Sequence, residues 1–135
     1  MIRHLLSVDD DDVTRMIIRK MLELVGQEVR LDTVANGQEA LDWLGCRQDG
    51  SFPDLILLDL NMPVMDGWVF LDRFSAMQPD LCPHTAAAIL TSSSNPRDLS
   101  APRACPFVAG CFFKPLTLKT MAEILRLCPP PAVPS

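Results

Sequence analysis

Five short apolar runs alternate with segments of helical periodicity along the chain, and this alternation limits its folds more than any other feature. The helical segments repeat apolar side chains every three or four residues, whereas the runs between them have the length of β-strands. The expected strands cover residues 4–8, 28–34, 54–60, 86–91 and 107–113. Alternating strands and helices are typical of α/β proteins with a parallel sheet.

The run DLILLDL at residues 54–60 is apolar almost throughout, as expected for a central strand covered on both faces. Crossover connections of one hand place the helices on both sides of such a sheet. We therefore predict an α/β fold with a doubly wound, five-stranded parallel sheet. A chain of 135 residues has the size of one domain, which we place at residues 1–128, with a disordered proline-rich tail at 129–135.

Several helix ends are indicated by residue types that favour caps or interrupt helices. The candidate N-caps are Asp12, Asn36 and Thr117, and the candidate C-cap is Gly26. Pro79 and Pro83 are expected to close the helix that covers residues 66–77. The weakest helical segment lies at residues 92–106, where Pro102 would interrupt any longer helix.

Composition excludes several classes of partner and location. The net charge of -5 and the pI near 4.8 argue against direct binding to nucleic acid, which requires a clustered basic surface. No apolar run approaches the roughly 18 residues of a membrane span, and no signal peptide opens the chain. The five cysteines show no metal-binding spacing and are expected to be reduced thiols. We expect a cytoplasmic protein without membrane insertion.

Polar side chains follow four of the five expected strands. Asp9 and Asp10 come after the first strand, Asp59 follows LILL, Thr91 follows AAIL and Lys114 follows GCFF. In parallel sheets, ligands collect at the carboxyl ends of the strands. Three carboxylates at one point suit Mg²⁺, while a hydroxyl and an amine can hold phosphoryl oxygens. Because a carboxylate can itself accept a phosphoryl group, the set indicates phosphoryl transfer to an aspartate.

Four segments carry a resemblance to a known family: VDD at 8–10, LLDLNMPVMDG at 57–67, LTS at 90–92 and KPL at 114–116. Together they closely resemble the receiver domain of bacterial two-component response regulators, of the chemotaxis-regulator type. The resemblance spans residues 3–128 with the motifs in the family's order and spacing. It implies the flavodoxin-like receiver fold.

The resemblance assigns roles around one aspartate. Asp59 would be the phosphoacceptor, receiving the group from a sensor histidine kinase or a phosphotransfer protein. Asp10 and Asp59 would bind Mg²⁺ (or Mn²⁺) directly, Asn61 would add its backbone carbonyl, and Asp9 would act mostly through water. Asp11, like Asp12, has no role in the family and is better explained by the positive end of the helix that follows.

The resemblance also implies a switch region. Thr91 would turn its hydroxyl to the phosphoryl group, Lys114 would pair with it, and Pro115 would follow a cis peptide bond. Receivers usually carry an aromatic residue three positions before the lysine, and Cys111 stands there instead. The usual aromatic switch is therefore in doubt, and Pro102 alters the face that many receivers use for output.

No output domain follows, so the chain is expected to be a stand-alone receiver that catalyses only its own phosphorylation and dephosphorylation. It would signal by conformational switching, by docking to a downstream protein that the sequence does not identify, or by phosphorelay. The sequence leaves open whether the protein forms a homodimer. Two alternatives stay open as well. One is a pseudo-receiver that binds partners without phosphorylation. The other is a haloacid-dehalogenase-like phosphatase, because DDDDV at 9–13 satisfies that superfamily's motif with Asp9 as nucleophile and Asp11 as acid/base.

Overall fold

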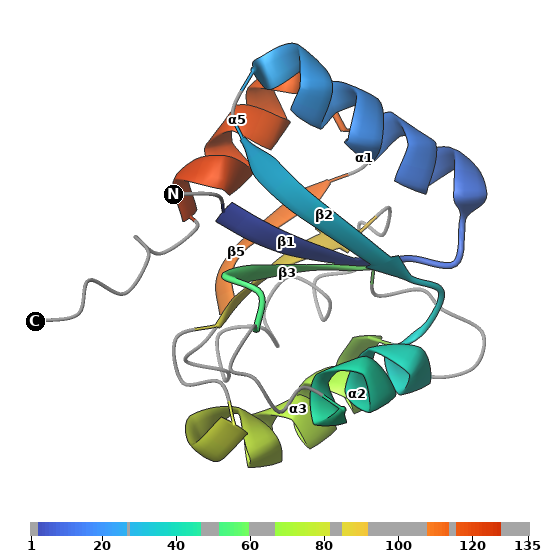
Figure 1. The fold of residues 1–135 in the computed structure, drawn as a ribbon, viewed down its shortest axis with the longest axis vertical. Coiled ribbons are helices and arrows are strands. Elements are labelled where there is room, and N and C mark those ends of the chain that lie inside the picture. Colours follow the sequence, from blue (N-terminus) through green and yellow to red (C-terminus); the bar gives the residue numbers. More distant parts are fainter. Residues whose placement is uncertain are drawn as a thin grey trace, which may run out of the picture.

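The chain folds into alternating strands and helices, as the sequence predicted (Figure 1). This computed structural model describes residues 3–26, 28–46, 52–59, 67–81, 85–91, 108–113 and 116–127. The strands are β1 (Arg3–Val8), β2 (Val29–Val34), β3 (Leu55–Asp59), β4 (Ala86–Thr91) and β5 (Val108–Phe113). The helices are α1 (Asp12–Val25), α2 (Gly37–Gly45), α3 (Gly67–Leu81) and α5 (Leu118–Leu127).

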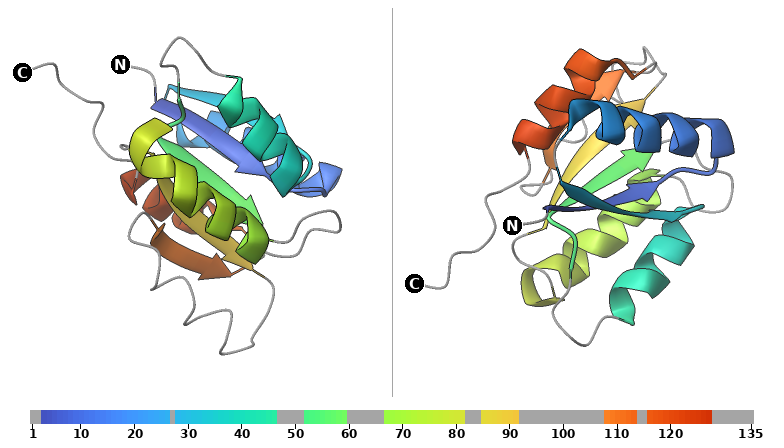
Figure 2. Two further views of the ribbon diagram at one scale, coloured as in Figure 1. Left: turned by 90° about the horizontal axis from the view of Figure 1, so that it is seen from below. Right: turned by 45° about the horizontal axis from the view of Figure 1, so that its top comes forward.

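The five strands form one sheet in the order β2-β1-β3-β4-β5, and every pairing between neighbours is parallel. The helices α1 and α5 cover one face of this sheet, and α2 and α3 cover the other (Figures 1 and 2). The predicted doubly wound parallel sheet is confirmed, with β3 at its centre. All carboxyl ends of the strands therefore lie along one edge of the sheet.

Two apolar cores form, one on each face of the sheet, because side chains alternate along a strand. In β3, Leu55 and Leu57 contribute to the core under α1 and α5, whereas Ile56 and Leu58 contribute to the core under α2 and α3. All five residues of β3 are buried, as the continuous apolar run predicted. The core under α1 and α5 also contains Leu5, Ile18, Leu22, Ala88, Leu90, Met121, Ile124 and Leu125. The core under α2 and α3 also contains Leu6, Val8, Val34, Ala40, Leu44, Phe70, Leu71, Phe74, Ala87 and Ile89.

Three of the predicted helix caps are confirmed. The Asn36 side chain accepts a hydrogen bond from the Glu39 N–H at 2.9 Å, which begins α2. The Thr117 hydroxyl accepts from the Thr120 N–H at 3.1 Å, which begins α5. Gly26 ends α1 with a φ of 75°, a left-handed conformation that glycine adopts without strain. These caps fix where α1, α2 and α5 start or stop relative to the sheet.

The prediction that Pro79 closes the third helix was wrong, because α3 continues to Leu81. Pro79 lies in the last turn of α3, so the helix runs past it before it ends. Pro83, the segment 92–106 with Pro102, and the tail 129–135 lie outside the described residues. Across the parts of the chain that the structure describes, no helix is both long and apolar enough to cross a bilayer.

Candidate functional site

The strand register brings the predicted acidic residues together at the carboxyl edge of the sheet. Val8, the last residue of β1, pairs with Leu58, so Asp9 leaves the sheet beside Asp59 at the end of β3. Asp59 in turn pairs with Leu90, the residue before Thr91. The ends of β1, β3 and β4 therefore deliver Asp9, Asp59 and Thr91 to neighbouring positions.

Three carboxylates converge at this edge. One oxygen atom from each of Asp9, Asp10 and Asp59 lies within 4.8 Å of the other two. Asp9 and Asp59 are nearly buried, at 1% and 4% exposure, whereas Asp10 is exposed. Carboxylates held this close repel one another unless a cation offsets their charge. A set of hard oxygen donors with one side open to solvent fits Mg²⁺ or Mn²⁺, which bind through a few carboxylates and keep several waters.

Backbone hydrogen bonds hold Asp9 in place. Its N–H donates to the Val34 carbonyl at 3.2 Å, which ties the end of β1 to the end of β2. Its side-chain Oδ1 accepts from the Asp11 N–H at 2.9 Å. One carboxylate oxygen of Asp9 is thus engaged by the loop backbone. The Asp9 side chain is therefore held in place within the cluster.

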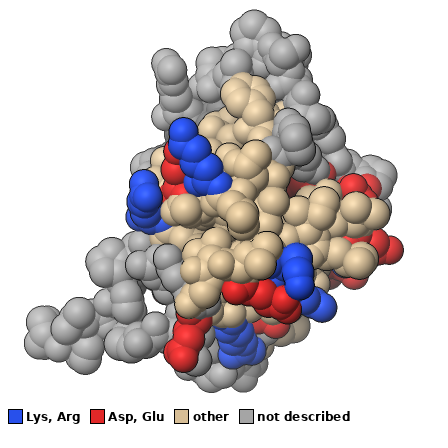
Figure 3. Space-filling view, turned by 90° about the horizontal axis from the view of Figure 1, so that it is seen from above, with Lys and Arg blue, Asp and Glu red and all other residues tan. Residues whose placement is uncertain are grey.

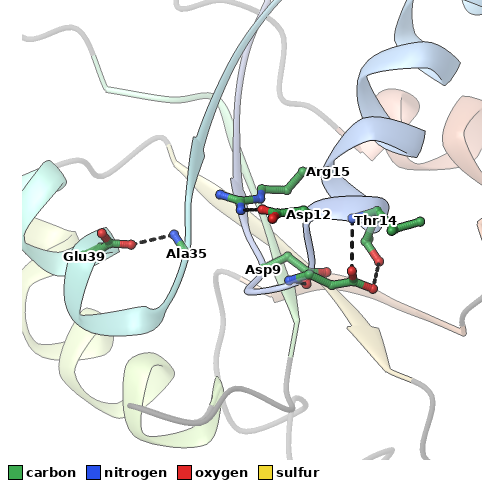
Figure 4. Close-up of polar contacts among 8 residues, drawn as sticks. Asp9, Asp12, Thr14, Arg15, Ala35 and Glu39 are labelled. Carbon is green, nitrogen blue, oxygen red and sulfur yellow. Dashed lines mark hydrogen bonds and ion pairs between the residues drawn. The ribbon is translucent and has the colours of Figure 1, made fainter.

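The helix that follows the acidic run is capped by Asp11. Its carboxylate accepts from the Val13 N–H at 3.0 Å and from the Thr14 hydroxyl at 3.0 Å (Figure 4). The predicted N-cap at Asp12 was therefore wrong by one residue. Asp12 is instead the first residue of α1, where it pairs with Arg15 and its charge favours the positive helix end.

A second capped turn lies beside the acidic cluster, at the start of α2. The Glu39 carboxylate accepts from the Ala35 N–H at 2.7 Å (Figure 4). The Asn36 side chain in turn accepts from the Glu39 N–H. This reciprocal arrangement resembles a capping box and fixes the turn after Val34, the residue that holds the Asp9 N–H. Sequence reasoning missed the contribution of Glu39. The spacing of Asn36 and Glu39, N-cap and third helical position, is the signal that would have found it.

Of the other predicted site residues, the structure describes Thr91 and Cys111. Thr91 is fully buried at the end of β4, paired in register with Phe113 of β5. Cys111 is half-buried and packs against the core under α2 and α3. Asn61, Lys114 and Pro115 lie outside the described residues, so their predicted roles stay predictions.

Comparison with known proteins decides the family. Residues 5–126 match the family model for the response regulator receiver domain. The chain belongs to the receiver-domain family. Receivers of this family work in two-component signalling with histidine kinases or phosphotransfer proteins, and the fold and acidic cluster of this receiver agree with that membership.

Two solved structures share the receiver fold over nearly the whole chain. A two-component response regulator from Cytophaga hutchinsonii has a TM-score of 0.79 at 26% identity, covering 92% of this chain and 94% of that one. The chemotaxis protein CheY4 of Vibrio cholerae, crystallised at low pH, has a TM-score of 0.76 at 26% identity, covering 95% and 99%. The resemblance to chemotaxis-type receivers is thereby confirmed.

Curated relatives include longer proteins. A protein-glutamate methylesterase/protein-glutamine glutaminase of Anaeromyxobacter dehalogenans is 40% identical over 76 residues, which are 56% of this receiver but 20% of the relative. The receiver thus spans a small part of that relative's length. The likeness concerns the shared receiver, and no enzyme activity follows from it.

Proposed function

We propose that this receiver accepts a phosphoryl group on Asp59 from the phosphohistidine of a sensor histidine kinase or a phosphotransfer protein. The observation that carries the proposal is the convergence of the Asp9, Asp10 and Asp59 carboxylates within 4.8 Å at the carboxyl edge of the sheet. Asp59 is nearly buried and is the member of the cluster that ends the central strand. Its position is the one that the family's motif gives to the phosphoacceptor.

The transfer is a nucleophilic displacement at phosphorus. A carboxylate oxygen of Asp59 forms a bond to the phosphorus atom, and the bond between phosphorus and the donor imidazole nitrogen breaks. The imidazole leaves with the electron pair of that bond, and the product is an aspartyl phosphate. Burial of Asp59, which is 4% exposed, limits the water that could compete for the group.

Asp10 and Asp59, with the backbone carbonyl of Asn61, would hold Mg²⁺ directly, and Asp9 would hold it through water. When bound, the ion offsets the carboxylate charges and the charge on the phosphoryl oxygens. The bond from the Asp11 N–H holds the Asp9 side chain in place.

Thr91 and Lys114 would hold the remaining phosphoryl oxygens through a hydroxyl hydrogen bond and an ammonium pair. The new group adds nearly two negative charges at the strand ends, which would bias the segments around Thr91, Cys111 and Pro115 between two arrangements. We propose that a downstream protein or a further phosphotransfer step reads this change in the cytoplasm. The proposed domain covers residues 1–128.

The phosphatase and pseudo-receiver hypotheses assign different roles to the aspartates of this site. In the phosphatase hypothesis Asp11 would be the acid/base, but its carboxylate caps α1 through Val13 and Thr14. The family assignment argues against that hypothesis as well. The pseudo-receiver hypothesis predicts an acidic cluster that takes up no phosphoryl group, and the experiment below separates it from the proposal.

The test is the intact mass of the protein after incubation with acetyl phosphate, with Mg²⁺ or with a chelator. We expect the native protein to gain one phosphoryl group only when Mg²⁺ is present. Asp59→Asn should gain none, whereas Asp72→Asn, which neutralises an exposed carboxylate on α3, should behave as native. Equal uptake by Asp59→Asn and native protein would refute the assignment, and no uptake by any of them would favour the pseudo-receiver.

A further inference from the structure

The strand β2 lies at one edge of the sheet, with β1 as its neighbour. The backbone N–H and C=O groups of successive residues in a strand point to opposite sides. The Val34 carbonyl accepts from the Asp9 N–H and therefore points toward β1. By this alternation, the backbone groups of Val29, Leu31 and Thr33 point away from the sheet. In the part of the chain that the structure describes, no strand pairs with this outer side of β2.

Two opposite charges lie on one face of β2. Arg30 and Asp32 are two residues apart, and Arg30 Nε lies 3.3 Å from Asp32 Oδ2. Their side chains are 56% and 30% exposed. The His4 Nε2 atom also lies 2.6 Å from Asp32 Oδ2. Both contacts engage the same carboxylate oxygen, which leaves Asp32 Oδ1 able to accept from a further cation.

We propose that β2 pairs with β2 of a second copy of this chain, antiparallel and with a two-fold axis at Leu31. In this register Leu31 lies opposite Leu31, and Val29 of each copy lies opposite Thr33 of the other. The residues whose backbone groups point outward thus form the hydrogen-bonded pairs of the new ladder. Arg30 of each copy falls opposite Asp32 of the other, in the non-hydrogen-bonded pairs where side chains come closest.

Charge selects both the register and the occupant. A parallel copy in register would place Arg30 opposite Arg30, and like charges directly opposite destabilise a strand pair. Charged residues on an edge strand commonly oppose pairing. Here, however, a base and an acid two residues apart match an antiparallel copy of the same strand. The contact is symmetric and closed, so it gives a dimer and not a fibre.

The rest of the molecule agrees with this contact. Because the two strands run in opposite directions, the acidic clusters lie at opposite ends of the joined sheet. The helix α1 contacts β2. On the side covered by α1 and α5, basic side chains lie beside acidic ones and form no block of one sign (Figure 3). The edge that bears Asp59 stays open in each copy, so this inference does not rest on the proposed function.

The test is the mass of the full chain in solution, measured by sedimentation equilibrium at concentrations up to about 1 mM. A contact through one strand edge is small, so we expect native protein to dimerise with a Kd of about 100 µM. Arg30→Asp makes the opposed pairs repulsive, and Thr33→Pro removes an outward N–H without a loss from the ladder to β1. Each should weaken dimerisation about tenfold or more. Arg73→Asp, the same charge reversal at an exposed position on α3, should leave it unchanged.

A mixture of two variants tests the register itself. Arg30→Asp carries two acids on this face of β2, and Asp32→Arg carries two bases. Each should dimerise poorly alone, whereas a 1:1 mixture should form a heterodimer in which every opposed pair is attractive. Circular dichroism checks that Asp32→Arg is folded, since it loses the contact with His4. If it is not, Arg30→Asp and Thr33→Pro decide the outcome.

Two results would overturn the proposal. The first is native protein that stays monomeric up to about 1 mM, which would leave the outer side of β2 to a strand of another protein. The second is a dimer that either Arg30→Asp or Thr33→Pro leaves as tight as native, which would assign the contact to another surface. A dimer that both variants weaken, and that Arg73→Asp does not, supports pairing through β2.

Discussion

At the scale of single residues, two of the buried hydroxyls, those of Ser7 and Thr85, differ in their hydrogen bonding. Thr85 is 2% exposed, and its hydroxyl donates to the Pro53 carbonyl at 2.6 Å. Ser7, the residue before the last in β1, has no exposure, and its Oγ has no hydrogen-bond partner among the described residues. A buried hydroxyl without a partner costs stability because it has lost water and gained nothing in exchange.

We therefore expect Ser7→Ala to raise the free energy of unfolding by about 1 kcal/mol, measured by urea denaturation. The matched control is Thr85→Val, which removes a hydroxyl of similar burial that does have a partner. That variant should lower the free energy of unfolding by about 1 to 3 kcal/mol, because the Pro53 carbonyl loses its donor. Destabilisation by Ser7→Ala would mean that the Ser7 hydroxyl is satisfied after all.

At the scale of elements, the start of α1 shows how one aspartate run serves two purposes. Asp9 and Asp10 belong to the carboxylate cluster, Asp11 caps the helix, and Asp12 begins it. The same loop thus sets the position of the site and of the helix. Any change that moves the cap shifts the Asp11 N–H, which is the donor to the Asp9 carboxylate.

The roles of Asp11 and Asp12 can be separated by substitution. Asp11→Ala should lower the free energy of unfolding by about 1 kcal/mol, because the first turn of α1 loses the acceptor for the Val13 N–H. Asp12→Ala should cost only a few tenths of a kcal/mol, since it removes an exposed pair and a favourable charge at the helix end. Denaturation of both variants in parallel measures the difference, and the reverse order would restore Asp12 as the cap.

Much of the fold and of the candidate site followed from the sequence. Apolar runs located all five strands to within a residue or two, and the topology then placed Asp9, Asp10 and Asp59 at one edge. The register between β4 and β5 could not be predicted from the sequence. Ala87 pairs with Val108 but Ala88 pairs with Gly110, so one residue of β5 is extra.

That irregularity explains the burial of Cys111. Val108 and Cys111 are three residues apart and would face opposite sides of a regular strand. With one extra residue between them, both pack against the core under α2 and α3. A strand bulge depends on packing between segments that are distant in the sequence, so the local sequence does not predict it. The same holds for which of four consecutive aspartates caps the helix.

At the scale of the whole molecule, we expect the carboxylate cluster to link the stability of the fold to cation binding. Asp9, Asp10 and Asp59 hold like charges within 4.8 Å of one another in the folded chain, whereas unfolding separates them. Their repulsion therefore opposes folding when no cation is present. A cation that binds only the folded state stabilises it by mass action, by about 2.7 kcal/mol at a hundred times its Kd.

Two changes in thermal stability follow from the cluster. Mg²⁺ should raise the Tm of native protein in a concentration-dependent way. Asp59→Asn should have a higher Tm than native protein in chelator, by the equivalent of about 1 kcal/mol, and should lose most of the Mg²⁺ effect. Asp72→Asn should keep the native response, because its carboxylate is exposed on α3. An equal Mg²⁺ response in all three proteins would show that the ion binds elsewhere.

The central claim is that one aspartate, Asp59, carries the phosphoryl group. An aspartyl phosphate reacts with hydroxylamine, which displaces phosphate and leaves a hydroxamate on the same side chain. Mass spectrometry of peptides from native protein, treated with acetyl phosphate and Mg²⁺ and then with hydroxylamine, locates that hydroxamate. We predict it at Asp59 and nowhere else, and its loss without Mg²⁺. A hydroxamate at Asp9 would contradict the account and support the phosphatase hypothesis, and its absence from every peptide would contradict phosphorylation altogether.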